Sequence, residues 1–411
     1  MSNRSLKPME VHALSQFVYE ADGTYQSVRS ESPGKSNVAV RKEAEFLLKS
    51  AAPTKGLQLN TDQFSLLTAK SGLFNLEKLT GFGFVAQGIG GRSGELVLAT
   101  RGTNFEDNKF DLGTDANCGV SRGPRNLPVH RGFLKTFRGY QQELVHFVTD
   151  GGRKRPSTIH CMGHSLGGAL ANLNAVALYD HGFDVHLYTI GSPRVGVHSF
   201  AADITRHIPA SKIYRAVNPC DVVPMMPLYP FMHGSSGTSE YLVDNGSDKI
   251  SLQAHFMSEG YLPMSRKTSW SDFPQPENYL RASIRDLNAE LAKVGGGHMF
   301  SKTVLVLINR ALVELAKALG YVTLICLQST FSNLFTAADL LSEILTKAYY
   351  AGKEFLEAVR SVLNGMLQFM GRLALVQETI EVTTLRWIVN QFRSDMGGRA
   401  QQAMNQAMRL A

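Results

Sequence analysis

The chain has 411 residues, of which 44% are apolar and 19% charged, and this is the composition of a folded globular protein rather than a disordered one. Its 42 Lys and Arg residues exceed its 35 Asp and Glu residues, for a net charge of +7. Over this length the excess is too dilute to indicate a nucleic-acid partner, although it is compatible with an anionic membrane surface.

The first part of the chain alternates between helical and strand-like patterns. Apolar residues at helical spacing predict a helix over 8–20, and β-like runs follow at 81–88 and 95–102. The elements predicted after them are a helix at about 132–149, a strand at 157–162, a helix at 166–180 and strands at 184–190 and 212–217. This alternation is typical of an α/β fold with parallel strands. The polar, Gly-rich segment 104–128 is predicted to be a long binding loop or lid.

The sequence pattern changes near residue 271, and few strand-like runs follow. Within 341–370, apolar residues fall on one helical face and charged residues largely on the other. We therefore expect an α/β body over residues 1–270 and a C-terminal all-α module over 276–411. The segment Ala318–Ala338 has the length of a bilayer span, but its polar residues favour a buried helix.

The N-terminal residues contain no apolar segment of a cleavable signal peptide. We therefore expect the protein to be cytoplasmic until a route that needs no signal exports it, and to act as a secreted protein. The four cysteines are far apart, which predicts reduced thiols. The 12 histidines form neither an HExxH motif nor a His-x-His pair, and no phosphate-binding P-loop motif occurs, so we expect no metal and no cofactor.

The segment Gly163-His164-Ser165-Leu166-Gly167 is a GxSxG motif between a predicted strand and a predicted helix. Its glycines permit a sharp turn that presents the Ser165 hydroxyl above the edge of the sheet. The first N–H groups of the new helix point at the same place, where they would stabilise a developing negative charge. We predict that Ser165 is a nucleophile and that the Leu166 N–H is an oxyanion donor. The motif alone leaves open a tight turn with an inactive serine.

Five segments in order resemble the class 3 (fungal-lipase-like) lipases, a family of α/β-hydrolases. They are ATRGT (99–103), VHRGF (129–133), GHSLGGALA (163–171), YTIGSPRVG (188–196) and VNPCDVVPMMP (217–227). The resemblance extends over about residues 80–262. It implies an α/β-hydrolase sheet flanked by helices, and a serine carboxylester hydrolase that acts on lipids through a Ser-Asp-His triad and an acyl-enzyme.

The resemblance also implies roles for residues on either side of Ser165. It assigns the acid of the triad to Asp221 and a second oxyanion donor to Thr103. In α/β-hydrolases the histidine follows the acid in the sequence, which leaves His233, His255 and His298. The resemblance favours His255 as the base, with His233 second, and we expect His298 to be a loop residue.

The loop after Asp221 is unusually apolar. Flexible thioethers and aromatic rings beside a triad suit an acyl-chain pocket, so Met225, Met226, Leu228 and Phe231 are predicted to bind substrate. The alternative is that they are ordinary core residues. We expect a phospholipase, with the A1 type favoured. A triacylglycerol lipase, an esterase of soluble esters, and a non-catalytic membrane-binding or pore-forming effector with a hydrolase scaffold are the alternatives.

The helical module departs from the resembled family, which usually ends soon after the base. Its amphipathic, basic helices are expected to contact a membrane surface. A bundle packed on the body, or a docking surface for a protein, is the alternative. The architecture is similar to that of bacterial phospholipase effectors, which implies an inhibitor, immunity or accessory protein as a partner.

Overall fold

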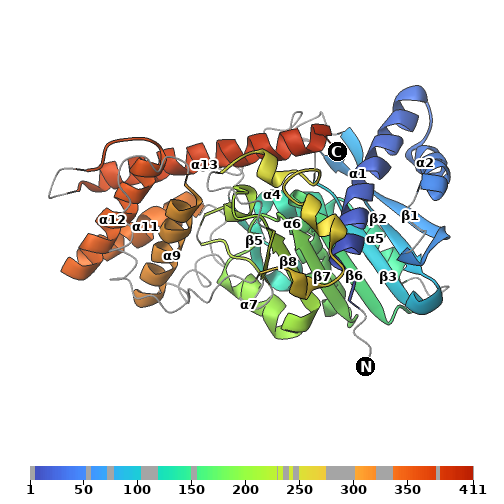
Figure 1. The fold of residues 1–411 in the computed structure, drawn as a ribbon, viewed down its shortest axis with the longest axis horizontal. Helices are drawn as coiled ribbons and strands as arrows, with labels where there is room; N and C mark the ends of the chain where they lie inside the picture. The colour runs from blue at the N-terminus through green and yellow to red at the C-terminus, as the bar shows by residue number, and fades with distance from the viewer. Residues whose placement is uncertain are drawn as a thin grey trace.

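The computed structural model describes residues 5–51, 57–71, 78–102, 119–149, 155–228, 230–234, 240–243, 250–274, 301–320, 337–375 and 380–410. Figure 1 shows an α/β body and a group of C-terminal helices, with one long helix extending from that group to the body.

Within the described residues, seven strands form one sheet in the order β1-β2-β3-β6-β7-β8-β9. They are β1 (Leu59–Ser71), β2 (Lys78–Gly88), β3 (Glu95–Thr100), β6 (Thr158–His164), β7 (Val185–Ile190), β8 (Ile213–Val217) and β9 (Glu240–Leu242). The first three strands are antiparallel, and the strands from β3 to β9 are parallel. A separate antiparallel pair consists of β4 (Val120–Arg122) and β5 (Pro128–His130).

The helices cover both faces of the sheet and build the C-terminal group. They are α1 (Pro8–Glu31), α2 (Asn37–Ala51), α4 (Arg131–Arg138), α5 (Gln141–Thr149), α6 (Leu166–Asp180), α7 (His198–His207), α9 (Lys302–Ala318), α11 (Ala337–Ala351), α12 (Lys353–Phe369) and α13 (Val382–Leu410). The short 3-10 turns are η1 (Gly90–Arg92), η2 (Pro124–Asn126), η3 (Ala210–Lys212), η4 (Val223–Met225), η6 (Gln253–His255), η7 (Leu262–Arg266) and η8 (Trp270–Asp272).

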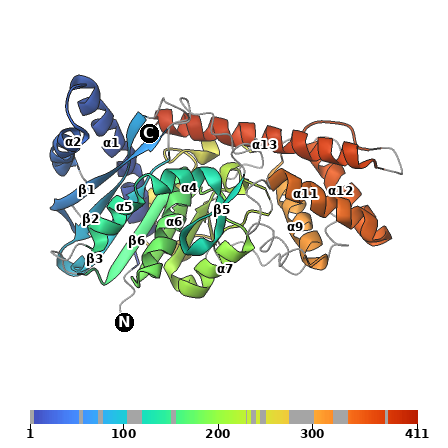
Figure 2. The same ribbon diagram turned by 180° about the vertical axis from the view of Figure 1, so that it is seen from behind.

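Side chains along the central strands alternate between two apolar clusters. Along β3, Leu96 and Leu98 join the cluster that contains residues of α4, α5 and α6, whereas Val97 and Ala99 join the cluster that contains residues of α1 and α2. Figure 2 shows α4, α5 and α6 in front of the sheet. This alternation follows from the pleat, which turns successive side chains to opposite faces. Because both faces are covered, every residue of β3 is buried, polar ones included.

The C-terminal helices α9, α11, α12 and α13 pack on one another, and α13 reaches from them to the body (Figures 1 and 2). On the body it contacts η4 and η6. Buried apolar residues of all four helices belong to the same cluster as the α6 face of the sheet. The boundary expected between residues 270 and 276 stays a prediction, because residues 275–300 lie outside the described part of the chain.

The predicted fold class is confirmed: a mixed sheet with a parallel section is flanked by helices and followed by C-terminal helices. The helix predicted over 132–149 is two helices, α4 and α5, because the chain turns at Gly139 and Tyr140. The elements α2, β1, β4, β5, α7 and β9 were not predicted. β4 lies in the stretch 104–128 that was expected to be a loop, and residues 103–118 lie outside the described part of the chain. None of the helices in the described residues is long and apolar enough to cross a bilayer, and most of Ala318–Ala338 lies outside those residues.

Candidate active site

The GxSxG segment forms the turn from β6 into α6. β6 pairs with β3 on one side and β7 on the other, so this turn lies inside the parallel section and not at its edge. Ser165 has φ 59° and ψ −133°, a conformation that costs a non-glycine residue about 1–3 kcal/mol. Its N–H donates to the Ile190 carbonyl oxygen, and its own carbonyl accepts from the Gly168 N–H, each at 2.9 Å. These bonds hold the strained residue in place.

The start of α6 packs directly on the end of β3. A Cβ at Gly167 would lie 2.1 Å from the Thr100 carbonyl oxygen, so only glycine fits there. The Thr100 hydroxyl lies 2.8 Å from the Gly167 carbonyl oxygen. This close approach fixes the N-terminus of α6, where the Leu166 N–H has no partner within its own helix. The positive end of the α6 dipole therefore faces the region beside Ser165.

Three side chains from separate segments meet at this edge of the sheet. His255 Nε2 lies 2.8 Å from Ser165 Oγ, and His255 Nδ1 lies 2.7 Å from Asp221 Oδ2. Asp221 follows β8, and His255 is the last residue of η6. All three are buried, and only Ser165 retains exposed surface, at 4%. In this geometry the imidazole can take the hydroxyl proton while the carboxylate stabilises the resulting imidazolium.

The Asp221 carboxylate has two further donors. The Tyr261 hydroxyl donates to Oδ2 at 2.7 Å, and the Val223 N–H donates to Oδ1 at 2.9 Å. Gly191, with φ 56°, leaves room for this arrangement: a Cβ there would lie 2.9 Å from both Asp221 Oδ2 and the Tyr261 hydroxyl oxygen. Burial, and then the Asp221 charge, raise the pKa of Tyr261 well above its ordinary value. Tyr261 is therefore a neutral donor, and the carboxylate is held in one orientation.

A second histidine supports the loop of His255. His164 Nε2 lies 2.8 Å from the His255 carbonyl oxygen, and the two rings have their centroids 4.7 Å apart. Burial lowers the pKa of His164 well below its ordinary value, and the charge that His255 can carry lowers it further. His164 is therefore neutral, and adds no positive charge next to His255.

The other sequence-predicted residues fall into two groups. His233 is engaged elsewhere: its Nε2 lies 2.8 Å from the Pro224 carbonyl oxygen and 2.6 Å from Arg215 Nη2. Burial, followed by the Arg215 charge, lowers the pKa of His233 well below its ordinary value. Thr103 and His298 lie outside the described residues.

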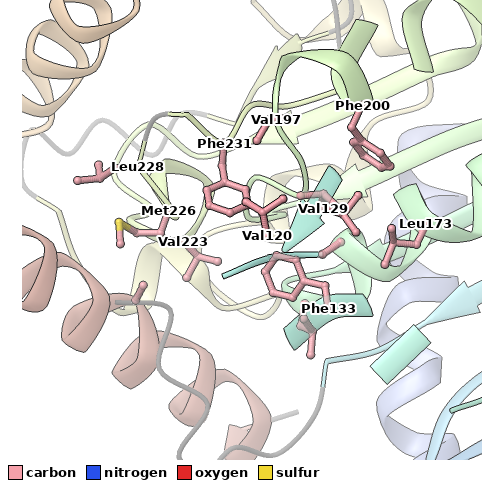
Figure 3. Close-up of a cluster of buried hydrophobic side chains, with 14 of the residues drawn as sticks. Val120, Val129, Phe133, Leu173, Val197, Phe200, Val223, Met226, Leu228 and Phe231 are labelled. Atoms are coloured by element: carbon pink, nitrogen blue, oxygen red, sulfur yellow. The ribbon is translucent and has the colours of Figure 1, made fainter. Parts of the chain in front are cut away.

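The apolar loop after Asp221 lies in the larger apolar cluster. Met226, Leu228 and Phe231 are buried there, and Met225 is partly buried against it. In Figure 3, Phe231 lies beside Val120, whereas Met226 and Leu228 lie on the side of the loop nearer the C-terminal helices. Their predicted contact with an acyl chain stays a prediction.

Arg194 fastens this apolar loop to the body. The Arg194 backbone N–H donates to the Met226 carbonyl oxygen at 2.7 Å, and the side-chain Nη1 donates to the Pro227 carbonyl oxygen at 3.3 Å. The guanidinium is buried, which lowers its pKa to about 9, and the nearby Arg215 charge acts in the same direction. The GSPRVG segment therefore holds the loop that follows Asp221.

Two tyrosines of this site were not found from the sequence as hydrogen-bonding residues. Tyr261 contacts Asp221, and Tyr19 of α1 contacts His164 at 2.8 Å. The sequence gives no signal for either role, because a tyrosine among apolar residues is typical of a core position. Within the described chain, no three His, Cys, Asp or Glu side chains gather as a metal site requires.

Residues 97–231 match the model of the family described as Lipase (class 3). That range begins in β3, contains the Ser165 turn and Asp221, and ends at Phe231. Over these residues the chain is similar to the class 3 lipases. The class 3 lipase segment is thus the part of the body that carries the GxSxG turn and the acid.

Three curated relatives of this class 3 lipase segment have different names. A secreted mono- and diacylglycerol lipase 1 of Fusarium solani is 35% identical over 162 residues, 37% of this chain and 45% of that protein. Toxin TseL of Vibrio cholerae is 31% identical over 134 residues, 32% of this chain and 20% of the toxin. Phospholipase A1-II 6 of Oryza sativa subsp. japonica is 30% identical over 159 residues, 30% of this chain and 38% of that protein. The chain spans less than half the length of each.

Proposed function

We propose that this protein is a serine carboxylester hydrolase that acts on lipids, with phospholipids as the favoured substrates and the A1 position as the favoured bond. The observation that carries the proposal is the line of hydrogen bonds from Ser165 Oγ through His255 to Asp221. A hydroxyl, an imidazole and a carboxylate in this order form the machinery of acyl transfer.

In the proposed reaction, Ser165 Oγ bonds to the ester carbonyl carbon while His255 Nε2 takes the hydroxyl proton. The carbonyl oxygen becomes an oxyanion, which the N–H groups of Leu166 and Thr103 stabilise by about 3 kcal/mol each. The C–O bond to the alcohol then breaks, and His255 gives its proton to the leaving oxygen. A water molecule, deprotonated by His255, attacks the acyl-enzyme, which releases the fatty acid and restores Ser165.

Two kinds of support favour a lipid over a small soluble ester. The loop after Asp221 supplies Met225, Met226, Leu228 and Phe231, which are apolar enough to hold an acyl chain. Relatives of the matched segment carry the names of a mono- and diacylglycerol lipase and a phospholipase A1. A triacylglycerol lipase and a soluble esterase use the same chemistry and are separated from the proposal by substrate alone.

We further propose that the C-terminal helices contact a membrane surface. Where α12 turns toward α13, Leu373 is 93% exposed and Trp387 is 47% exposed. The Arg372 guanidinium lies 5.0 Å from the Trp387 ring centroid. An exposed Leu and Trp beside arginine suit the interface between lipid headgroups and acyl chains.

The toxin among the relatives supports a role as a secreted effector. A lipid hydrolase produced inside a cell endangers that cell's own membrane, so we propose an inhibitor, immunity or accessory protein as its partner. The other class of function, a membrane-binding or pore-forming effector with an inactive hydrolase body, has no use for the bonds between Ser165, His255 and Asp221.

The deciding experiment measures fatty-acid release by wild type and Ser165→Ala from three substrates. These are vesicles of phosphatidylglycerol and phosphatidylethanolamine, an emulsified triglyceride, and a short soluble ester. Ser157→Ala, at the exposed residue just before the same strand, is the matched control. We expect release from the vesicles, lost in Ser165→Ala by about a thousandfold or more and retained in Ser157→Ala.

Each outcome of this experiment separates one alternative. Ser165-dependent cleavage of triglyceride or soluble ester alone would identify a lipase or an esterase and refute the phospholipase. Full activity in Ser165→Ala would refute the serine mechanism. No hydrolysis in any substrate, together with vesicle leakage, would favour the non-catalytic effector.

A further inference from the structure

Tyr19 of α1 lies between two segments that flank Ser165. It is buried, and its hydroxyl oxygen lies 2.8 Å from His164 Nδ1. The backbone of Gly102 is close enough to this hydroxyl to oppose the rise in its pKa that burial causes. Gly102 follows the end of β3, and His164 is the last residue of β6. One side chain from the N-terminal helix therefore contacts His164 and lies near the segment that follows β3.

The direction of each hydrogen bond follows from the groups involved. The His255 carbonyl oxygen can only accept, so His164 Nε2 carries the ring proton. His164 Nδ1 must then accept, and the Tyr19 hydroxyl donates to it. Burial raises the pKa of Tyr19 and lowers that of His164, so both are neutral and the direction of the chain is fixed.

The residue Gly102, just after β3, lies against a predicted oxyanion donor. A Cβ at Gly102 would lie 3.3 Å from the Leu166 Cβ and 3.7 Å from the Leu166 nitrogen. The same strand end is held a second time from α1, because Asp22 Oδ2 lies 2.8 Å from Arg101 Nη2. Arg101 Nη1 donates to the Gly102 carbonyl oxygen at 2.5 Å. Tyr19 and Asp22 are three residues apart, on one face of the helix.

We propose that Tyr19 is a positioning residue for this reaction, whose hydroxyl holds His164 and the loop of His255 against α1, the helix that Asp22 ties to the strand end before Thr103. The inference rests on the proposed function. Oxyanion donors and the general base must keep a fixed spacing around Ser165 for catalysis. The hydrogen bonds from Tyr19 through His164 to the His255 carbonyl oxygen, together with the Asp22–Arg101 ion pair, link those two parts of the site through α1. Tyr19 touches no reacting atom and acts through His164.

The test compares Tyr19→Phe with Tyr25→Phe. Tyr25 is also buried in α1, and its hydroxyl donates to Asn37 Oδ1 at 2.5 Å, so both variants remove one hydrogen-bonding hydroxyl from the same helix. We expect Tyr19→Phe to lower kcat by about tenfold to a hundredfold, with KM changed by less than about twofold, because misplaced catalytic groups affect the chemical step. Tyr25→Phe should lower Tm by about as much as Tyr19→Phe does, but it should leave kcat unchanged.

A second readout needs no lipid. The rate at which a fluorophosphonate labels Ser165 reports how well the serine is activated, and it should fall in Tyr19→Phe in proportion to kcat. His164→Phe breaks the same link at its middle and serves if Tyr19→Phe does not fold. It should also lower kcat with KM retained.

The inference is overturned if the variants that fold keep wild-type kcat and labelling rate, or if kcat falls equally in Tyr25→Phe. Those results leave the proposed function intact as long as Ser165→Ala is inactive. Activity or labelling that persists in Ser165→Ala would instead overturn the proposed function itself. The two failures are therefore distinguishable.

Discussion

His255 and His233 both follow Asp221 in the sequence, but their ring nitrogens have different partners. Both nitrogens of His255 face groups of the proposed triad, whereas Nε2 of His233 faces the Pro224 carbonyl oxygen and Arg215. The environment of a histidine therefore separates two candidates that sequence order leaves together.

We expect His255→Ala to lower kcat by about a thousandfold or more, because the Ser165 proton loses its acceptor. His233→Ala should keep kcat within about tenfold of wild type. It should lower the free energy of unfolding by about 1–3 kcal/mol, since it leaves buried partners without a hydrogen bond. Steady-state kinetics and urea unfolding of both variants check this. An inactive His233→Ala beside an active His255→Ala would reverse the assignment of the base.

Stability is expected to depend on pH through a buried histidine outside the site. His130 packs against the rings of Phe133 and Phe231, and burial lowers its pKa from 6.5 to about 3. Below pH 6.5 His130 is protonated in the unfolded chain, whereas in the folded protein it stays neutral until about pH 3. Stability is therefore lost as the pH falls through this window, by about 2 kcal/mol at pH 5.

Urea unfolding at pH 7.5 and pH 5 measures this loss. In His130→Leu the loss between the two pH values should shrink by about 2 kcal/mol, whatever the variant's stability at pH 7.5. His181→Leu, at an exposed position, should leave the loss unchanged. An equal pH dependence in wild type and His130→Leu would show that His130 does not titrate in this way.

At the scale of elements, α13 is the helix that joins the C-terminal group to the site. It contacts η4, two residues after Asp221, and η6, which ends at His255. Its buried face includes Met396, Ala400 and Met404. The loops that carry the acid and the base are therefore supported by a helix that lies far from them in the sequence.

We expect Ala400→Glu to lower Tm by about 5 °C or more, because it buries a charge in an apolar cluster. Activity measured well below Tm should fall as well, since η4 and η6 lose their packing. Gln402→Glu places the same charge on the exposed side of α13 and should change neither. Thermal unfolding and ester hydrolysis check both variants. If activity is unchanged in a destabilised Ala400→Glu, α13 does not support the two loops.

The sequence predicted those elements whose signal is local. β6, the Ser165 turn and α6 were predicted within about two residues, because glycines and a strand-to-helix switch mark them. β1 was missed because LNTDQFSLLTAKS has a broken polar and apolar pattern, and its strand form depends on pairing with β2. The meeting of Ser165, Asp221 and His255 was predicted through family resemblance. The contacts of Tyr19, Tyr261 and α13 depend on distant parts of the chain and leave no local pattern.

At the scale of the whole molecule, the exposed apolar residues near the turn between α12 and α13 are expected to bind lipid. Leu373→Asp should weaken binding to vesicles of phosphatidylglycerol and phosphatidylethanolamine by about tenfold or more, since burying a leucine contributes about 1.5–3 kcal/mol. Hydrolysis of a short soluble ester should not change. Ile89→Asp removes an exposed apolar residue of the body and is the matched control. Equal binding by wild type and Leu373→Asp in a vesicle co-sedimentation assay would exclude this contact.

The contact of α13 with η6 also has a consequence for biosynthesis. A ribosome completes Ser165, Asp221 and His255 long before it reaches α13, which begins at Val382. Domains fold as their residues emerge, so the sheet can assemble while the loop of His255 still lacks its cover. The nascent chain thus carries every group of the proposed triad without the packing that holds two of them. Translation through α13 is then the step that completes the site, and hydrolytic activity should first appear there.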